Sequence, residues 1–302
     1  MSTNILEPAT RMGTVTLRVA NLDAMTSYYQ DVVTLDVVSQ THETVTLGRG
    51  GVPIVNLEYA PELQHAAPGQ AGLFHTAILF ETQAALAAAV YSVATKAPST
   101  FTGSSDHLVS QAFYFDDPEG NGIELYWDRE RTAWSWTHGS VEMATLYLDP
   151  NVFLQEHLSP ELIEDPRVGG VTVGHVHLSI GSIAQARDFY VTQLGFEQTL
   201  AFGPSALFVS AGGYHHHMGL NVWNSAGAGR RQRTLGLGQV DVIVPTADAL
   251  QQTSERLVHF GRDVRHDGET LFVDDPWGNL IRLSAEPVGV AVAAELPGAA
   301  GE

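Results

Sequence analysis

Two histidines occupy matching places in a repeat of this 302-residue chain, and a glutamate ends one copy of a second repeat. Four short segments each begin with a glycine and carry a variable residue three positions later. These segments are 13–19, 72–78, 174–180 and 238–244. At that variable position the four segments carry Thr16, His75, His177 and Asp241. Two imidazoles with a carboxylate can hold a non-haem Fe(II) ion and leave coordination positions open for substrate and oxygen. The repeat therefore predicts a metal site.

The carboxylate comes from a repeated turn. Residues 116–124 read Asp-Asp-Pro-Glu-Gly-Asn-Gly-Ile-Glu, and residues 274–282 read Asp-Asp-Pro-Trp-Gly-Asn-Leu-Ile-Arg. Pro, Gly and Asn are turn-forming residues, so a strand is expected on each side of both copies. The second unit thus ends with Glu124 and the fourth with Arg282, whose guanidinium would repel a cation.

A single histidine on the inward face of a strand is more often a hydrogen-bonded core residue than a ligand. Two at equivalent repeat positions, with Glu124 at the third expected place, make the core interpretation improbable. If the first and second units pair, the partner residue is Thr16 and the triad fails. If the second and third units pair, the partner is His177 and the triad is complete. We favour the second arrangement.

The elements that position these residues follow the same repeat. Each segment reads as a first strand, a helical pattern follows it, and alternating strand patterns close the unit. The helical patterns cover Asp23–Val33, Gln83–Ala94, Ala184–Gln193 and Ala247–Phe260. We expect an α+β protein of four βαβββ modules in two tandem domains, 1–127 and 172–286. The connector, 128–171, should contain a short helix near Leu158, and the tail, 287–302, shows no periodicity.

Composition limits the function classes. The net charge of −19, with 15 Lys and Arg residues, argues against nucleic acid and anionic membranes as partners. The absence of cysteine excludes disulfides, thiol nucleophiles and thiolate-held clusters. Neither a signal peptide nor a long apolar run is visible, so we expect a cytoplasmic protein.

The residues also resemble a family. The pattern His107-x5-Phe113-Tyr114-x2-Asp117-Pro118-x-Gly120-x3-Glu124 is similar to the signature of the type I extradiol ring-cleavage dioxygenases of the vicinal oxygen chelate superfamily. Ser105, two residues before the histidine, is a mild departure from it. The stretch 210–223 resembles bacterial two-domain catechol 2,3-dioxygenase-like proteins. The resemblance extends from about Gly13 to Leu283 and implies a paired glyoxalase/extradiol-dioxygenase-like fold.

The resemblance implies a function and roles for the residues that carry it. The reaction would be extradiol cleavage of a catechol-type substrate with dioxygen at Fe(II), with Mn(II) as the alternative metal. Glu124 and His75 match the ligands of one module, and His177 would supply the partner module's histidine. Tyr114 would hydrogen-bond a substrate oxygen, and His107 would shape the ring pocket. A small aromatic diol and O2 are the expected partners, and a homo-oligomer is open.

Three consecutive histidines lie in the second half of the chain. On a strand, His215 and His217 would share a face and His216 would point the other way. One of the two same-facing residues would serve as the acid/base group, because an imidazole titrates near neutrality. A fourth metal ligand or a surface cluster are the alternatives. Asn221 and Trp223 would continue this strand and line the pocket, although a tryptophan there could equally belong to the core.

Two other functions stay open at this point. A glyoxalase-type isomerase on the same fold would need a fourth protein ligand, for which the 215–217 run offers candidates. A non-enzymatic protein that binds an aromatic compound or a drug would need no triad. Wide separation of His75, Glu124 and His177 would favour the binding protein.

Overall fold

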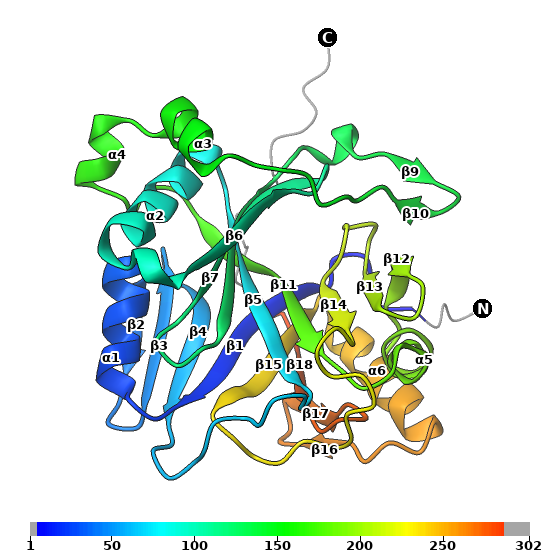
Figure 1. Cartoon of the computed structure of the whole chain (residues 1–302). Helices are drawn as coiled ribbons and strands as arrows, with labels where there is room; N and C mark the ends of the chain where they lie inside the picture. Colours follow the sequence, from blue (N-terminus) through cyan, green and yellow to red (C-terminus); the bar gives the residue numbers. More distant parts are fainter. Residues whose placement is uncertain (1–4, 287–302) are drawn as a thin grey trace.

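The computed structural model describes residues 5–286, and the predicted tail at 287–302 lies outside them. The first half of the chain forms two units of similar build (Figure 1). The first unit consists of β1 (Arg11–Val19), α1 (Leu22–Ser27), the π-helix η1 (Tyr28–Val32), β2 (Asp36–Gln40), β3 (Thr44–Arg49) and β4 (Val52–Tyr59). The second consists of β5 (Gly72–Phe80), α2 (Gln83–Lys96), the 3-10 turn η2 (Pro98–Thr100), β6 (Phe101–Asp106), β7 (Ser110–Asp116) and β8 (Gly122–Asp128).

A connector and two further units follow. The connector contains the 3-10 turn η3 (Arg131–Ala133), β9 (Trp136–Thr137), β10 (Ser140–Val141), α3 (Pro150–His157) and α4 (Pro160–Glu164). The third unit consists of β11 (Val171–Ser179), α5 (Ile183–Ala186), the π-helix η4 (Arg187–Gln193), β12 (Glu197–Phe202), β13 (Ala206–Ser210) and β14 (Met218–Asn221). The fourth consists of β15 (Gly236–Val244), α6 (Ala247–His259), β16 (Arg265–His266), β17 (Thr270–Asp274) and β18 (Leu280–Ala285).

The units combine across the two halves of the chain into two eight-stranded sheets. One sheet has the strand order β16-β17-β18-β15-β1-β4-β3-β2, and the other β12-β13-β14-β11-β5-β8-β7-β6. We call them the β1/β15 sheet and the β5/β11 sheet after their central antiparallel pairs. The second unit therefore pairs with the third, as predicted. The predicted α+β architecture of four βαβββ modules is also confirmed.

Each module's helical segment begins close to where its sequence pattern predicts. The two long helices start at threonine caps: the hydroxyl of Thr82 accepts from the backbone N–H of Ala85, and Thr246 does the same for Ala249. The helices of the other two modules continue as π-helices, η1 and η4. Across residues 5–286, no helix is both long enough and apolar enough to cross a membrane.

One hydrophobic core joins the two sheets. It takes side chains from the helices and from the helix-facing side of both sheets, including Leu17 of β1, Ile78 of β5 and Leu178 of β11. Because side chains alternate along a strand, the neighbours of these core residues face the other way. On β8, Ile123 and Leu125 belong to the large core, whereas Tyr126 lies in a separate cluster on the opposite face. We call that opposite face of the β5/β11 sheet its inner face.

The repeated turn ties together the two units of each half. Asp117 accepts hydrogen bonds from the backbone of Glu119 and Asn121 and from the hydroxyl of Tyr29 in the first unit, 3.1 Å away. In the second half, Asp275 accepts a bond of 3.0 Å from the hydroxyl of Tyr190. Each half is thus bonded internally through a buried tyrosine and aspartate, while its strands pair with those of the other half.

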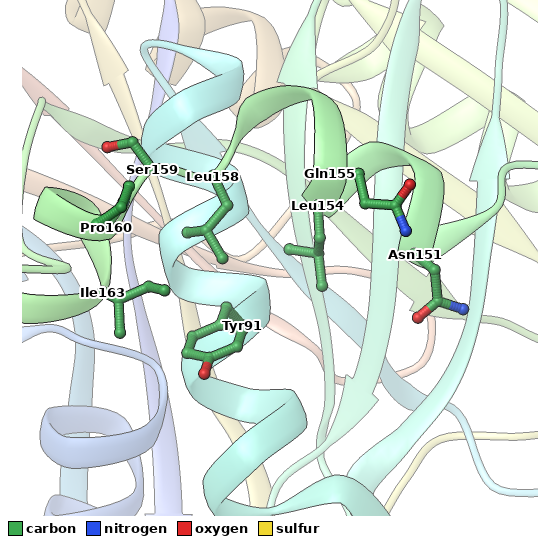
Figure 2. Close-up of a pocket in the computed structure, with 8 residues that line it drawn as sticks. All are labelled: Tyr91, Asn151, Leu154, Gln155, Leu158, Ser159, Pro160 and Ile163. Atoms are coloured by element: carbon green, nitrogen blue, oxygen red, sulfur yellow. The ribbon is translucent and has the colours of Figure 1, made fainter.

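The connector forms more structure than the predicted short helix. Helices α3 and α4 pack beside α2, at the upper left of Figure 1. A shallow hollow of about 390 Å³ lies between them, with Tyr91 of α2 facing Leu158 and Ile163 (Figure 2). Its lining residues include no histidine, aspartate or glutamate, so this hollow could not hold a site of imidazole and carboxylate ligands.

Candidate metal centre

The central strands of the β5/β11 sheet bring two histidines together. In their antiparallel register Thr76 lies opposite Val176, and Ala77 lies opposite His175. The pairing is symmetric about the Thr76–Val176 pair, as if a half-turn about that pair exchanged the two strands. A residue of β5 and the residue 100 positions later in β11 therefore occupy equivalent places. By this symmetry the equivalent of His75 is His175.

Glu124 completes a three-residue group. It lies on β8, the parallel neighbour of β5, next to Ala77. Its Oε2 atom lies 2.9 Å from Nε2 of His75 and 3.1 Å from Nε2 of His175. Within residues 5–286, His75, Glu124 and His175 form the one group of three or more His, Asp or Glu side chains that each offer a donor atom within 4.8 Å of the others.

Burial prepares these donors for a cation. The three residues are at most 6% exposed. Burial lowers the pKa of His175 to about 4, so its ring is neutral at neutral pH and has a lone pair to give. Burial alone would raise the pKa of Glu124, but the imidazoles of His175 and His75 hold that pKa well below its usual range. His75 Nε2 is buried, and although it lies 2.9 Å from Glu124 Oε2, it makes no hydrogen bond of good geometry to any described residue. Two imidazoles and a carboxylate are a donor set that fits a divalent metal.

His177 lies beside this group and is not part of it. Its ring centroid is 5.0 Å from that of His75, and its buried Nε2 has no hydrogen-bond partner in the described chain. The sequence repeat matches His177 with His75. In the sheet, the residue equivalent to His75 is His175, two positions earlier. The sheet equivalent of Glu124 is Gly219, which lies next to His177 on β14, and a Cβ there would come within 2.8 Å of the His177 ring. The histidine ring fills the space where a fourth donor would lie.

The family-like motif places Tyr114 and His107 at the edge of the group. Tyr114 lies opposite Glu124 across β7 and β8, and its ring centroid is 5.7 Å from that of His75. His107 bridges the Tyr114 hydroxyl, 2.7 Å from Nε2, and the carbonyl of Ala144, 2.7 Å from Nδ1. The connector thus fixes the orientation of His107.

The three consecutive histidines do not lie on a strand, in contrast to the prediction. Strand β14 begins at Met218, and residues 211–217 form the loop before it. Alternation of faces therefore does not apply. The middle residue, His216, lies nearest the metal group, with its ring centroid 4.0 Å from that of His175. In this loop His216 lies close to the metal group, whereas on a strand it would have faced away from it.

The outer two histidines of the run have other partners. His215 Nε2 lies 2.9 Å from Asp128 Oδ1. His217 Nδ1 accepts from the backbone N–H of Ala211 at 3.1 Å, and burial lowers the pKa of His217 to about 3. This bond anchors His217 within its own loop.

Asn221 and Trp223 differ in burial. Asn221 ends β14 and is fully buried, and its Oδ1 accepts from the backbone N–H of Trp223. Trp223 lies beyond the strand and is 51% exposed, so it belongs to no core. Its ring packs against those of Phe74 and His177, with centroids 5.3 and 5.4 Å apart. The two residues therefore border the His177 side of the site.

Neither His175 nor Asp128 was predicted from the sequence, and His216 was expected to face away from His215 and His217. His175 lies two residues before His177, and both face inward because side chains alternate along β11. A comparison of the residues that follow each histidine would have found it, since 75–80 and 175–180 are both a histidine followed by an apolar-rich strand. No local pattern indicated Asp128.

Comparisons with known proteins now decide the family. The model of the Glyoxalase/Bleomycin resistance protein/Dioxygenase superfamily matches residues 11–125 and 172–283. The chain belongs to this superfamily. The two matched ranges coincide with the two tandem halves, so the family recognised from the motif is confirmed.

Superfamily relatives include a dioxygenase by name. The chain is 31% identical to the "Catechol-2,3-dioxygenase" of Bacillus subtilis (strain 168) over 272 residues, which cover 88% of this chain and 94% of the relative. The crystal structure of a putative dioxygenase from Bacillus subtilis subsp. subtilis str. 168 matches with a TM-score of 0.63 and 14% identity, covering 92% of this chain and 85% of that one. Glyoxalase I from Zea mays matches with a TM-score of 0.55 and 14% identity, covering 92% of each chain. Both structures share the fold.

Proposed function

We propose that this protein cleaves the ring of a catechol-type substrate beside its diol, with dioxygen, at a non-haem divalent metal. Fe(II) is the expected metal and Mn(II) the alternative. The convergence of His75, Glu124 and His175 carries the proposal, because these three are the donors of a facial triad. The catechol-2,3-dioxygenase relative of Bacillus subtilis supports it.

The ligand assignment that we propose is His75, Glu124 and His175. His177 was the ligand expected from the repeat, and the geometry favours its neighbour by placing His175 Nε2 beside the carboxylate. When bound, the metal would bring a diol and oxygen together and stabilise negative charge on the diol. The carboxylate and neutral imidazoles would leave one net positive charge on the centre for that task.

Tyr114 would orient the diol. The carbonyl of Ala144 can only accept, so His107 donates to it from Nδ1, and its Nε2 lies 2.7 Å from the Tyr114 hydroxyl. Tyr114 is left with oxygen lone pairs, which can accept a hydrogen bond from a substrate hydroxyl. On the other side of the group, His216 lies where an imidazole could take the proton of that diol.

The isomerase alternative lacks a carboxylate at the position where the partner module would supply it. A glyoxalase-type site would use the position equivalent to Glu124 in the partner module, and that position is Gly219. A non-enzymatic binding protein would not need the three convergent donors. Both observations favour the dioxygenase.

The test is anaerobic reconstitution with Fe(II), or with Mn(II), followed by a catechol and oxygen. A yellow ring-opened product is expected from at least one of several substituted catechols. Metal content measured on the same samples separates a failure to bind metal from a failure to react. A protein that holds one equivalent of iron and turns over none of these catechols would contradict the proposal.

A further inference from the structure

A buried amide on the inner face of the β5/β11 sheet has a donor without a partner. Asn221 is the last residue of β14, and its neighbour Leu220 belongs to the large core on the other face. Because side chains alternate along a strand, the Asn221 side chain faces inward. The residue is 0% exposed, and its Nδ2 atom makes no hydrogen bond to any described residue. A buried donor of this kind costs stability until an acceptor meets it.

The oxygen of the same amide shows which atom is the donor. Oδ1 of Asn221 lies 3.1 Å from the backbone nitrogen of Trp223, whose N–H can only donate. The amide oxygen therefore faces Trp223, and the second amide position is the NH2 group. A bond of this kind from two residues further along the chain forms an Asx turn. Beyond this turn, the Trp223 ring packs against those of Phe74 and His177.

Asn221 is displaced from the metal group along the sheet. Gly219 of β14 lies opposite His177 of β11, and His177 lies opposite His75 of β5. Asn221 comes two residues after Gly219, so it lies about 7 Å beyond this row, at roughly 3.3 Å per residue. That displacement is similar to the length of a substituted benzene ring. A diol held at the metal could therefore place a ring substituent beside the amide.

The surrounding side chains indicate what this part of the inner face would bind. Three aromatic rings contact that of His177, namely Phe74, Phe208 and Trp223, with centroids 5.1, 5.7 and 5.4 Å away. Such rings favour an aromatic ligand. An amide NH2 group can only donate, so the matching substituent must carry an acceptor. The region thus combines apolar walls with one buried donor.

We propose that Asn221 is a specificity-determining residue, whose Nδ2 donates a hydrogen bond to an oxygen acceptor on a substituent of the catechol ring. The substrate class is a catechol with a carbonyl oxygen on its substituent, as in an acyl or carboxyl group, beside Phe74 and Trp223. This inference rests on the proposed function, because a diol bound at the metal sets the position of the ring. An alkyl substituent of the same shape would leave the donor unpaired.

Binding without oxygen tests the inference before any turnover. The ligands are an acetyl-substituted catechol and its isopropyl counterpart, which have similar shapes and differ in the carbonyl oxygen. Calorimetry of the metal-loaded protein under anaerobic conditions gives the ratio of their affinities. Comparing this ratio between wild type and variants cancels the effect of the substituent on the acidity of the diol.

Asn221→Asp is the decisive variant. It keeps an oxygen to accept from the Trp223 N–H and replaces the donor nitrogen by an acceptor. The preference for the acetyl over the isopropyl ligand should fall by about 2- to 10-fold, the range of one neutral hydrogen bond. Asn56→Asp is the matched control, since it makes the same replacement on β4 of the other sheet, where Asn56 Oδ1 accepts from Thr46. The control should keep the wild-type preference.

Two outcomes of these measurements would overturn the inference. An unchanged preference in Asn221→Asp would show that water satisfies the amide and that the substituent does not reach it. An equal loss of preference in Asn56→Asp would show that the effect is not specific to this position. Trp223→Leu separates the wall from the donor, because it should weaken both ligands alike and keep their ratio.

Nuclear magnetic resonance of the wild-type protein gives a readout that needs no variant. With Zn²⁺ as a diamagnetic ion, the Asn221 side-chain NH2 protons should move downfield on binding the acetyl ligand and not on binding the isopropyl ligand. Identical spectra with the two ligands would contradict the proposed bond. If the preference depends on Asn221 but no catechol is cleaved, the proposed reaction fails and this subsite stands. Cleavage of catechols with no dependence on Asn221 would have the opposite meaning.

Discussion

The two sheets of this protein share one topology and differ in what their central strands carry. In the β5/β11 sheet the symmetric positions hold His75 and His175, and Glu124 lies beside them. The β1/β15 sheet is symmetric about Val15 and Val240, so the positions equivalent to the histidines hold Thr14 and Gln239. At these positions, only the β5/β11 sheet carries metal donors, although the two sheets share one topology.

The position of the glutamate differs in the same way. Its equivalents in the β1/β15 sheet are Asn56, beside Thr16, and Arg282, beside Asp241. Arg282 makes an ion pair of 2.9 Å with Asp241, which neutralises the one carboxylate of this group. The comparison teaches that the fold supplies positions and that a few side chains decide whether a cation can bind there.

The largest expected effect comes from replacing Glu124, in contrast to the same replacement at its equivalent in the other sheet. Glu124→Gln should strip the metal and lower kcat/KM by at least about 1000-fold, on the order of 4 kcal/mol, because a neutral amide replaces the charged donor. Arg282→Gln, at the equivalent position, should leave the metal content unchanged. Metal analysis and turnover of both variants measure this. Stoichiometric iron in Glu124→Gln would show that the ligand assignment is wrong.

A second comparison lies within the β5/β11 sheet. His175→Gln should weaken metal binding by more than the roughly 10- to 100-fold that an outer-sphere partner costs, whereas His177→Gln should retain one equivalent. Competition with a chromophoric chelator gives the affinities. The reverse outcome would restore the ligand that the repeat alone suggested.

The sheets also differ in how closely side chains cross their central strands. A Cβ at Gly174 would lie 1.7 Å from the hydroxyl oxygen of Tyr126, whereas one at the equivalent Gly238 would lie 3.1 Å from Thr16. Gly174→Ala should therefore lower the free energy of unfolding by about 3 kcal/mol, and Gly238→Ala by about 1 kcal/mol or less. Urea denaturation of the two variants checks the difference. Equal losses would mean that Tyr126 can move aside.

Acid stability should distinguish the sheets by a smaller amount. The buried histidines of the described chain all lie in the β5/β11 sheet or in the loop before β14. For His217, whose folded pKa is about 3, the unfolded chain binds a proton below about pH 6.5 and the folded chain does not, so stability falls as the pH falls.

His217→Asn, whose side-chain oxygen can replace Nδ1 as acceptor for Ala211, should remove this penalty. At pH 5 the loss in stability relative to pH 7 should be smaller in the variant by about 2 kcal/mol, from 1.5 pH units at roughly 1.4 kcal/mol each. Denaturation curves at the two pH values measure it. An unchanged pH dependence would show that the folded protein binds a proton at His217.

Much of this molecule could be predicted from its sequence because it repeats. The glycine-led strands, the helical patterns and the twin Asp-Asp-Pro turns predicted four modules, and the donor count predicted which modules pair. His75 and Glu124 are named by position in the repeat, and the structure places them 2.9 Å apart.

The third histidine could not be fixed by spacing, because register depends on long-range pairing. The register between β5 and β11 shifts on both sides of the symmetric centre, after Val173 and after His177. A shift of this kind has no local signature. The run 215–217 was misassigned for a related reason, because distant residues hold it as a loop. The backbone N–H of His217 donates to the carbonyl of Val209, the carbonyl of His215 accepts from the Thr199 hydroxyl, and the His217 ring accepts from the backbone N–H of Ala211.

The strand exchange between the halves has a consequence for biosynthesis. His75 and Glu124 are made early, but the proposed third donor at residue 175 follows the connector, and it reaches them only when β11 pairs with β5. A nascent chain of which only the first half has left the ribosome therefore has an incomplete site with two donors. Metal capture should occur late, as a checkpoint that the whole polypeptide has assembled, and truncated chains should not sequester metal from the cell.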